Sequence, residues 1–298
     1  MRKVLTVLIL FLLTSLHFAQ GDRFSYLLGD ELKNYTTPFV TTFGTIMNTA
    51  GYHSADIGDG FGFSFSIYAM YIMIPDDQKT FTAGTPAGYE TGSTATIYGD
   101  KGGAFIGPGG TIVYPPGVNQ SGIPAGMPQI AASFMGTELM VRFIPSITAG
   151  DASINFFGFG LRHSISRYIP KIPVDIAVQI LFNNFSIENA TTTNVQDYFK
   201  FSSSNFAFNV HASKTFGVFI LYGGLQYESS GFDIEYTYID RNGQNPLLDG
   251  TRASLEIDGD NSFRTTLGGA LKLGFFVLNA DYSLASQSIL TGGISFEF

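Results

Sequence analysis

Ionisable and amide side chains recur at every second position in several segments whose remaining positions are apolar. In residues 132–144, for example, Glu138 and Arg142 alternate with Leu139 and Val141. Side chains two residues apart lie on the same face of a β-strand, so such a segment has one polar and one apolar face. The polar faces of all these segments together contain Glu138, Arg142, Arg162, Asp175, Gln179, Asn183, Asn209, His211, Arg264, Lys272, Asn279, Asp281 and Glu297.

These polar faces suit the interior of a membrane barrel. A charge that faces lipid at mid-membrane costs about 2–4 kcal/mol, so we expect the charged groups to point into a lumen. There they offer two kinds of chemistry. Opposite charges can pair across strands and solidify a narrow barrel, or the same groups can line a selective path for a polar or amphipathic solute. A barrel of about ten strands has a small lumen, which argues against a general porin.

Catalytic chemistry has little support in the sequence. Barrel enzymes need a nucleophile or a carboxylate–histidine pair near the rim. Beyond the first twenty residues the histidines are His53, His163 and His211, and none of them lies in a recognisable motif with Ser, Asp or Glu. We therefore predict no enzyme activity, no catalytic residue, no metal site and no cofactor.

The elements that must position the polar groups follow an export signal. Arg2 and Lys3 precede an apolar run from Val4 to Leu16, and the small residue Ala19 follows, which predicts a cleaved signal peptide at residues 1–20. Its removal takes away two basic residues and no acid, so the net charge changes from −8 to −10. The chain has no cysteine, so no disulfide can stabilise the exported product.

Composition excludes several classes of protein. An acidic chain without a basic run is unsuited to binding nucleic acid, which depends on neutralising phosphates. Charged residues make up only 13% of the chain and aromatic residues 15%, so a soluble form would be poorly solvated. Beyond the signal the sequence has no run of about 18 or more apolar residues, which excludes a transmembrane helix. A closed β-barrel explains an exported, apolar chain of this kind.

The strand pattern predicts an all-β fold, an antiparallel transmembrane β-barrel of about 10 strands, with about 8–14 possible, over residues 53–298. Alternation with a period of two begins at Phe61 and continues to the C-terminus. The last strand places Ile294, Phe296 and Phe298 on one face. We interpret this ending as the signal through which barrel-assembly machinery recognises an outer-membrane protein.

One long region is less regular. Residues 80–130 are rich in Gly, Pro, Ser and Thr, which predicts a large loop. Counting strand directions back from the C-terminus requires one inward-running strand within this region. The candidates are Thr94–Tyr98 and Ala104–Tyr114.

Residues 216–240 and 252–273 are predicted to form one long hairpin, with a bulge near residues 229–231. Acidic residues on this hairpin could bind a divalent cation, or approach lipopolysaccharide that is bridged by cations. However, residues 258–261 lack the full spacing of a calcium loop, and a solvated acidic loop explains the cluster more simply. The cluster comprises Asp233, Glu235, Asp249, Glu256, Asp258 and Asp260.

The segment 21–52 is predicted to be helical and to precede the barrel, with its helix over residues 24–51. Thr37 can cap a helix, Pro38 fits the first helical position, and Gly51 fits the end. Apolar residues between them form one stripe. The helix could plug the lumen, close the periplasmic mouth or lie along the membrane surface. The simplest interpretation is a short amphipathic helix packed against the barrel end.

Two stretches carry a resemblance to a known family. Phe157–Asp175, and Gly60–Asp76 together with Lys79–Phe81, resemble an uncharacterised family of Bacteroidetes-type outer-membrane proteins that share a domain of unknown function. The similarity covers most of the chain after the signal, and its motifs are structural turns. It implies an outer-membrane barrel and carries over no activity or site.

The sequence leaves two functions open. One is a small-lumen channel or transporter for small or amphipathic solutes. The alternative is a non-conducting structural or assembly component that presents loops to partners. In either case we expect contact with outer-membrane lipid, lipopolysaccharide and the barrel-assembly machinery, and none with nucleic acid.

Overall fold

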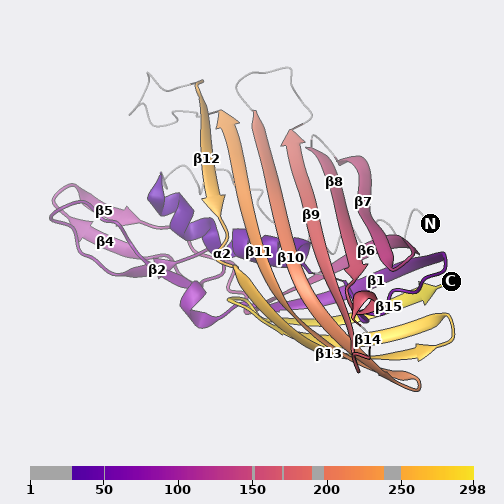
Figure 1. The fold of residues 1–298 in the computed structure, drawn as a ribbon. Helices are drawn as coiled ribbons and strands as arrows, with labels where there is room; N and C mark the ends of the chain where they lie inside the picture. The colour runs from indigo at the N-terminus through magenta and orange to yellow at the C-terminus, as the bar shows by residue number, and fades with distance from the viewer. Residues whose placement is uncertain (1–28, 50, 150–151, 170, 190–197, 238–249) are drawn as a thin grey trace.

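Ten antiparallel strands close into a barrel, with one helix at its mouth (Figure 1). The computed structural model describes residues 29–49, 51–149, 152–169, 171–189, 198–237 and 250–298. The predicted signal peptide, residues 1–20, lies outside the described residues.

The ring runs in the order β10–β9–β8–β7–β6–β1–β15–β14–β13–β11, and pairing of β10 with β11 closes it. The predicted ten-stranded antiparallel barrel is thus confirmed. An extra strand, β12 (Arg252–Asp258), pairs with the outer part of β11. The strands of the ring are β1 (Gly62–Met73), β6 (Gly122–Phe134), β7 (Thr137–Ala149), β8 (Ala152–Ser164), β9 (Asp175–Asn189), β10 (Phe199–Phe216), β11 (Phe219–Thr237), β13 (Phe263–Leu273), β14 (Phe276–Leu284) and β15 (Ile289–Glu297).

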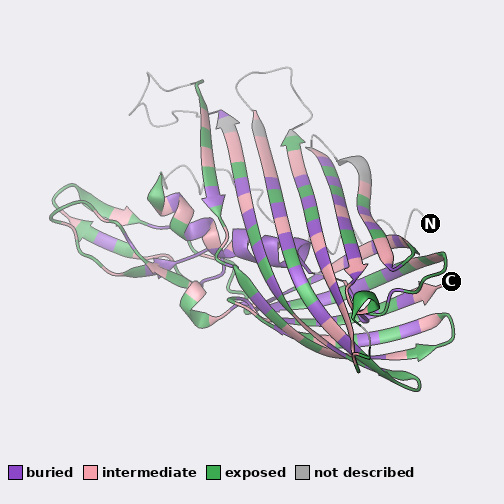
Figure 2. Ribbon diagram, in the orientation of Figure 1, coloured by how far each residue is buried: buried purple, intermediate pink, exposed green. Residues whose placement is uncertain are grey.

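The outer face of the barrel is apolar. Exposed and buried positions alternate along each strand (Figure 2). On β1, Phe65 and Ile67 are 38% and 40% exposed, whereas Ser66 between them is 2% exposed. Because the large exposed side chains are mostly Phe, Leu, Ile, Val and Tyr, lipid is the solvent that this surface requires.

Short turns identify one end of the barrel. The glycines Gly136, Gly217 and Gly274, in the turns after β6, β10 and β13, have φ angles of 73°, 63° and 66°, which glycine adopts without steric cost. Phe298 lies at the same end, where its amide donates to Phe63 O (2.9 Å). Short turns of membrane barrels face the periplasm. We therefore call this the periplasmic end and the opposite one the outer end.

Helix α2 (Asp30–Met47) lies at the outer end, and its bounds differ from the prediction. Pro38 lies inside the helix rather than at its first position. The carbonyl of Pro38 accepts hydrogen bonds from Thr42 Oγ1 (2.9 Å) and from Gln287 Nε2 (3.0 Å), in the β14–β15 connection, which joins this part of the helix to the barrel. The helix ends at Met47, before the expected Gly51. In the described part of the chain no helix is long and apolar enough to cross a membrane.

The region between β1 and β6 corrects two predictions. It contains the short helix η2 (Asp76–Gln78) and two small hairpins, β2 (Thr80–Thr82) with β3 (Ser93–Ala95) and β4 (Ala104–Gly107) with β5 (Gly110–Val113). Neither Thr94–Tyr98 nor Ala104–Tyr114 is the missing barrel strand. That strand is β6, whose two prolines, Pro124 and Pro128, weaken the strand pattern in the sequence.

The expected strand over residues 132–144 is also divided. Residues up to Phe134 belong to β6, a turn follows at Met135 and Gly136, and β7 begins at Thr137. Both halves have a period of two, but the inward positions are odd-numbered in β6 and even-numbered in β7. This change of phase is the trace of the turn, and the expected single strand overlooked it.

The long hairpin has its irregularity on the strand opposite to the one predicted. β11 is continuous through residues 229–231, whereas residues 259–262 interrupt the run from β12 to β13. Tyr227 pairs with Phe263 and Gly231 with Asp258, so the β12–β13 side carries one extra residue. That extra residue is the bulge.

Candidate functional site: a plugged lumen

The chain that follows α2 passes through the inside of the barrel. We call residues 44–49 and 51–57, which include the last turn of α2, the plug segment. It runs from the outer end, where Gly44 lies beside Ser230 of β11, to the periplasmic end, where β1 begins. The expectation of a helix packed against the barrel end is therefore met only by the first part of α2, because its last turn enters the lumen.

Two buried arginines of the barrel wall bind the C-terminal end of α2. Arg142 of β7 is 1% exposed and donates to Met47 O (3.1 Å) and Thr49 O (2.7 Å). Gln129 of β6 accepts from the same guanidinium at 3.0 Å. Within the described part of the chain no carboxylate pairs with Arg142. The free carbonyls at a helix C-terminus carry partial negative charge, so they act as the counter-charge of Arg142.

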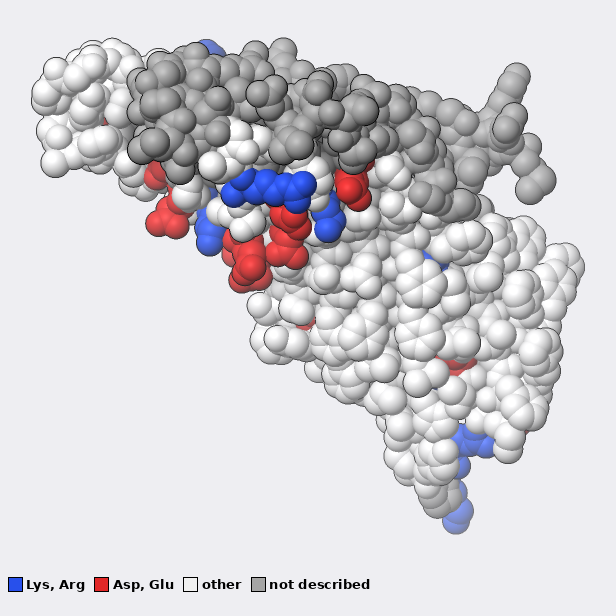
Figure 3. Space-filling view, turned by 90° about the horizontal axis from the view of Figure 1, so that it is seen from above, with Lys and Arg blue, Asp and Glu red and all other residues white. Residues whose placement is uncertain are grey.

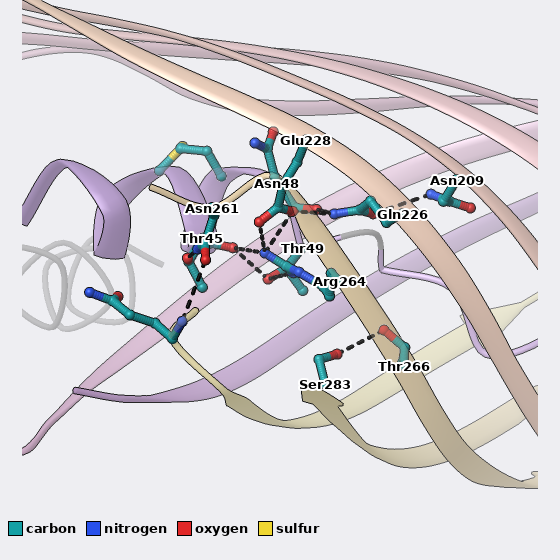
Figure 4. A network of polar contacts seen from close by, with 12 residues as sticks. Thr45, Asn48, Thr49, Asn209, Gln226, Glu228, Asn261, Arg264, Thr266 and Ser283 are labelled. Atoms are coloured by element: carbon teal, nitrogen blue, oxygen red, sulfur yellow. Dashed lines mark hydrogen bonds and ion pairs between the residues drawn. The ribbon is translucent and has the colours of Figure 1, made fainter. Parts of the chain in front are cut away.

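The second arginine belongs to a hydrogen-bonded network on β11 and β13 (Figure 4). Arg264 donates to Thr45 O (3.0 Å) and forms an ion pair with Glu228 (2.9 Å). Both side chains are almost fully buried, with exposures of 3% for Arg264 and 0% for Glu228. Gln226 donates to Asn48 O (2.9 Å), so a further free carbonyl after the helix is also satisfied.

A lower polar layer binds the remainder of the plug segment. Arg162 pairs with Glu138 (2.8 Å) and donates to Ser54 O (2.7 Å). The ring of Tyr52 stacks on His211, with 3.9 Å between ring centroids. The plug is therefore bound at several levels of the barrel, through both its backbone and its side chains.

Not all of the predicted polar residues contact the plug segment. Arg142, Arg162, Gln179, Asn183, Asn209, His211, Arg264 and Asn279 are buried inside the barrel, and Glu138, Asp175, Asp281 and Glu297 are partly buried. Lys272 lies at the periplasmic end with 49% of its side chain exposed, paired with Glu297 (2.7 Å). Of this set, contacts to the plug backbone are made by Arg142, Arg162, Asn183 and Arg264.

Sequence reasoning missed other residues of the same interior. Gln226 and Glu228 are even-numbered residues of β11, like the buried Tyr222, so they lie on the same inward face of the strand. Alternation could therefore have identified them. The bulge expected near residues 229–231 obscured the phase of this strand. Gln129 was missed because it lies within the region predicted as a loop.

A small cavity lies beside the plug segment. Its lining includes Thr49, Tyr52, Tyr68, Arg264 and Asp281, and its volume is about 10 Å³. A space of this size holds about one water molecule. The plug segment therefore leaves little space against the wall at this cavity.

Close packing between α2 and β11 gives a first testable prediction. A Cβ added to Gly44 would lie 2.2 Å from Ser230 Oγ, too close for any relaxed contact. Alanine favours an isolated helix over glycine by about 1 kcal/mol, yet here we expect Gly44→Ala to displace the plug. Faster proteolysis of the plug segment in the folded barrel would show the displacement. Adding Ser230→Gly removes the colliding group and should restore protection, whereas failure of this rescue would contradict the proposed contact.

One carboxylate–histidine pair occurs at the periplasmic end. His53 Nε2 lies 2.8 Å from Glu297 Oε1. Among the described residues no group hydrogen-bonds to the other ring nitrogen, Nδ1, so the pair has no hydroxyl nucleophile in contact. The pair instead fixes the chain just before β1 to the last strand.

One group of charged residues at the outer end lies on the exterior of the long hairpin. Figure 3 shows Lys, Arg, Asp and Glu gathered in one area of the surface seen from above. Most of the remaining described surface in that view belongs to other residue types. A shallow cleft on the β10–β12 face is lined by Lys200, Asp233, Glu235, Arg252 and Glu256. Among the described residues no group of three or more acidic or histidine side chains is arranged to hold a metal ion.

The closed ring, the apolar exterior and the occupied polar interior define a plugged transmembrane β-barrel. The chain belongs to a family described as "Family of unknown function (DUF6588)", whose model matches residues 1–298. No curated protein sequence matches the chain.

Solved structures with a similar arrangement are distant. The attachment invasion locus protein Ail of Yersinia pestis has 9% identity and a TM-score of 0.28, covering 81% of this chain and 100% of its own. The translocator domain of the autotransporter NalP from Neisseria meningitidis has 10% identity and a TM-score of 0.27, covering 87% and 92%. The toluene transporter TbuX of Ralstonia pickettii has 9% identity and a TM-score of 0.23, covering 82% and 90%. Similarity at this level carries no argument about function.

Proposed function

We propose that this protein is a gated outer-membrane conduit for small or amphipathic solutes, and that the plug segment is its gate. The observation that carries the proposal is the way the plug is bound. Arg142 inside the barrel wall has backbone carbonyls of the plug, rather than a wall carboxylate, as its main partners. A permanently solid barrel would be expected to satisfy such a charge within its own wall.

The binding of the plug is also of a kind that can be exchanged. The wall groups contact free carbonyls at Thr45, Met47, Asn48 and Thr49, which water or the polar group of a solute can replace. Hydrogen bonds exchanged in this way contribute about 0.5–1.5 kcal/mol net when both groups are neutral and about 1.5–3 kcal/mol when the donor is charged. The plug can therefore be held closed by many contacts and still leave when competing groups are supplied.

A reversible cross-link tests the gate. The side chains of Thr45 in α2 and Asn261 after β12 contact each other, and the chain has no cysteine of its own. We expect the oxidised Thr45→Cys/Asn261→Cys variant in proteoliposomes to pass no solute, because α2 is tied to the wall. Reduction should restore the flux of the unmodified protein.

The controls separate the effect of the disulfide from the effect of the substitutions themselves. Each single cysteine variant should behave alike with and without oxidant. A second pair, Ala132→Cys/Leu139→Cys, joins two residues that already pair across β6 and β7, and its oxidation should leave the flux unchanged. Equal flux through the oxidised and reduced forms of the Thr45/Asn261 pair would contradict gating by α2.

The alternative is a non-conducting structural or assembly component. The observation in its favour is the charged outer face of the long hairpin, with its cleft between Lys200 and Glu256, which offers a surface to other envelope components. An unmodified protein that shows no flux in any assay and co-purifies with stoichiometric partners would favour this alternative. We assign no catalytic role to either form.

The proposed location is the bacterial outer membrane, reached through a cleaved signal peptide at residues 1–20. The alternating apolar ending Ile294, Phe296 and Phe298 supports recognition by barrel-assembly machinery, and the apolar exterior supports contact with lipid and lipopolysaccharide. A Bacteroidetes-type envelope, implied by the resemblance of Phe157–Asp175, belongs to this proposal.

A further inference from the structure

The barrel wall is incomplete between β6 and β7. β6 pairs with β1 along its whole length, from Ser133 opposite Gly62 to Gly122 opposite Met73. β6 pairs with β7 over a short stretch only. This stretch begins where Phe134 lies opposite Thr137 and ends where Ile130 lies opposite Val141. Above this paired stretch, residues 122–129 of β6 and 142–149 of β7 have no partner strand on their facing edges among the residues that the structure describes. We call this part of the wall the β6–β7 seam.

Prolines keep the seam unpaired. At the outer end of β1, the amide of Met73 donates to the carbonyl of Ser288, beside β15, and the amide of Ile74 donates to the carbonyl of Ser121, beside β6. The even-numbered residues of β1 therefore direct their backbone groups toward β6. Along a strand, successive residues direct their backbone groups to opposite neighbouring strands. The register pairs even-numbered residues of β1 with odd-numbered residues of β6, so the even-numbered residues of β6 direct their backbone groups toward the seam. These include Pro124, Gly126 and Pro128, so two of the three positions lack an N–H. Proline on a strand edge prevents further pairing.

The opposite edge has a similar feature. Pro145 of β7 lies where the register between β7 and β8 shifts, between Ile144 and Ile147. Prolines on both sides indicate that the separation is a property of the sequence rather than fraying of a strand end.

The seam begins at a belt of exposed aromatic side chains. Phe143 of β7 and its register partner Phe157 are 53% and 54% exposed. Tyr71, which pairs with Pro124, is 46% exposed. Aromatic girdles mark the borders of the hydrocarbon in membrane barrels. The seam therefore lies at the outer border of the membrane, on the side of the outer leaflet.

Behind the seam lies an apolar chamber that α2 fills. The inward side chains of the unpaired part of β6 are Ile123, Ala125 and Met127, which are 7%, 6% and 3% exposed and belong to the same apolar cluster as Met47 of α2. Aromatic rings extend this cluster across the chamber, with Phe43 of α2 only 4.8 Å from Phe185 of β9 between centroids. The chamber would expose this apolar surface if α2 withdrew.

The floor of the chamber is cationic. Gln129 and Arg142, the lowest residues of the seam, begin the polar layer, and the guanidinium of Arg142 binds the carbonyls of Met47 and Thr49. A single-chain amphiphile with an anionic head matches both features. Its chain can replace the apolar face of α2, and its head can accept the hydrogen bonds that the two carbonyls accept in the closed state.

We propose that the β6–β7 seam is a lateral port through which single-chain anionic amphiphiles move between the outer leaflet and the chamber filled by α2. This inference rests on the proposed function, since it needs the plug to open. Because the port lies in the wall, the amphiphile chain need not cross the water-filled space above the barrel.

A reversible bridge across the seam tests the port. If the pairing of β6 with β7 continued two residues beyond Ile130 and Val141, Pro128 would lie opposite Phe143. Both of these side chains face outward. We expect the Pro128→Cys/Phe143→Cys variant, bridged by a short thiol-to-thiol reagent, to lose transfer of dodecanoate into vesicles. The reduced form of the same variant should retain transfer, which controls for the loss of the proline. The bridged Ala132→Cys/Leu139→Cys pair, on the same strands below the seam, should also retain it.

A second measurement does not depend on transport. Spin labels on the 128/143 pair should give a longer and broader distance distribution than labels on the 132/139 pair, which is paired in the sheet. Equal, narrow distributions would overturn the seam. If the unmodified protein transfers no dodecanoate above empty vesicles but passes other solutes, the port for anionic amphiphiles is overturned and the proposed function stands. If it passes no solute at all, the proposed function is overturned. If the unmodified protein transfers dodecanoate, and the bridged 128/143 variant transfers it equally well, the lateral port alone is overturned.

Discussion

Replacing Arg142 with alanine is expected to convert the closed barrel into one that opens readily. The substitution removes the donor to the carbonyl of Thr49 in a buried site, while the carbonyl of Met47 keeps only the amide of Asn183. A buried polar group left unpaired costs about 1–3 kcal/mol, and each 1.4 kcal/mol changes a population about tenfold. Single-barrel conductance in planar bilayers should therefore show open events about 5 to 100 times more frequent than in the unmodified protein.

The control removes an arginine that does not touch the plug. Arg167 pairs with Asp59 at the periplasmic end, where the side chain of Asp59 is 85% exposed. Arg167→Ala should leave the opening frequency unchanged, because an exposed pair contributes about 0–1 kcal/mol. Arg142→Lys retains a donor and should give an intermediate result. An Arg142→Ala protein as closed as the unmodified one would show that Arg142 does not hold the gate.

The second large effect is expected at Glu228. Its carboxylate is the ionic partner of Arg264, and their side chains are 0% and 3% exposed. Glu228→Ala leaves a buried guanidinium without its counter-charge, which typically costs about 3–5 kcal/mol. The free energy of unfolding of the refolded barrel in detergent, measured by urea titration, should fall by about this amount.

An exposed ion pair provides the matched control. Glu235 on the same strand lies 3.7 Å from Lys200, and its side chain is 38% exposed. Glu235→Ala should change the free energy of unfolding by about 0–1 kcal/mol. The Glu228→Leu/Arg264→Leu double variant removes both buried charges and should recover much of the stability lost in Glu228→Ala. A Glu228→Ala variant as stable as Glu235→Ala would mean that water reaches Arg264.

The sequence was informative wherever the signal was local. Alternation with a period of two identified the barrel and indicated which side chains share a face, because each strand must present one face to lipid and the other to the interior. It failed at β6, where Pro124 and Pro128 interrupt the strand pattern, and at the turn within residues 132–144, where the inward positions change from odd-numbered in β6 to even-numbered in β7. The position of Pro38 similarly misled the start of α2.

Contacts between distant segments were beyond this reasoning. Arg142 and the carbonyl of Met47 are far apart in the chain, and the pair of Glu228 with Arg264 depends on the register of two long strands. A polar face is compatible with ion pairs inside the wall, with water or with a plug, and its pattern is the same in all three cases. The route of the plug segment through the barrel therefore required the three-dimensional structure.

The amino-acid sequence by itself determined that these strands form a closed sheet with apolar groups outside, since a period of two is a property of each strand taken alone. Only the tertiary structure decided that α2 enters the lumen, that two arginines bind its carbonyl end, and that β6 and β7 separate near the outer border. The physical reason is that pairing and burial depend on partners brought together by folding, which no single segment specifies.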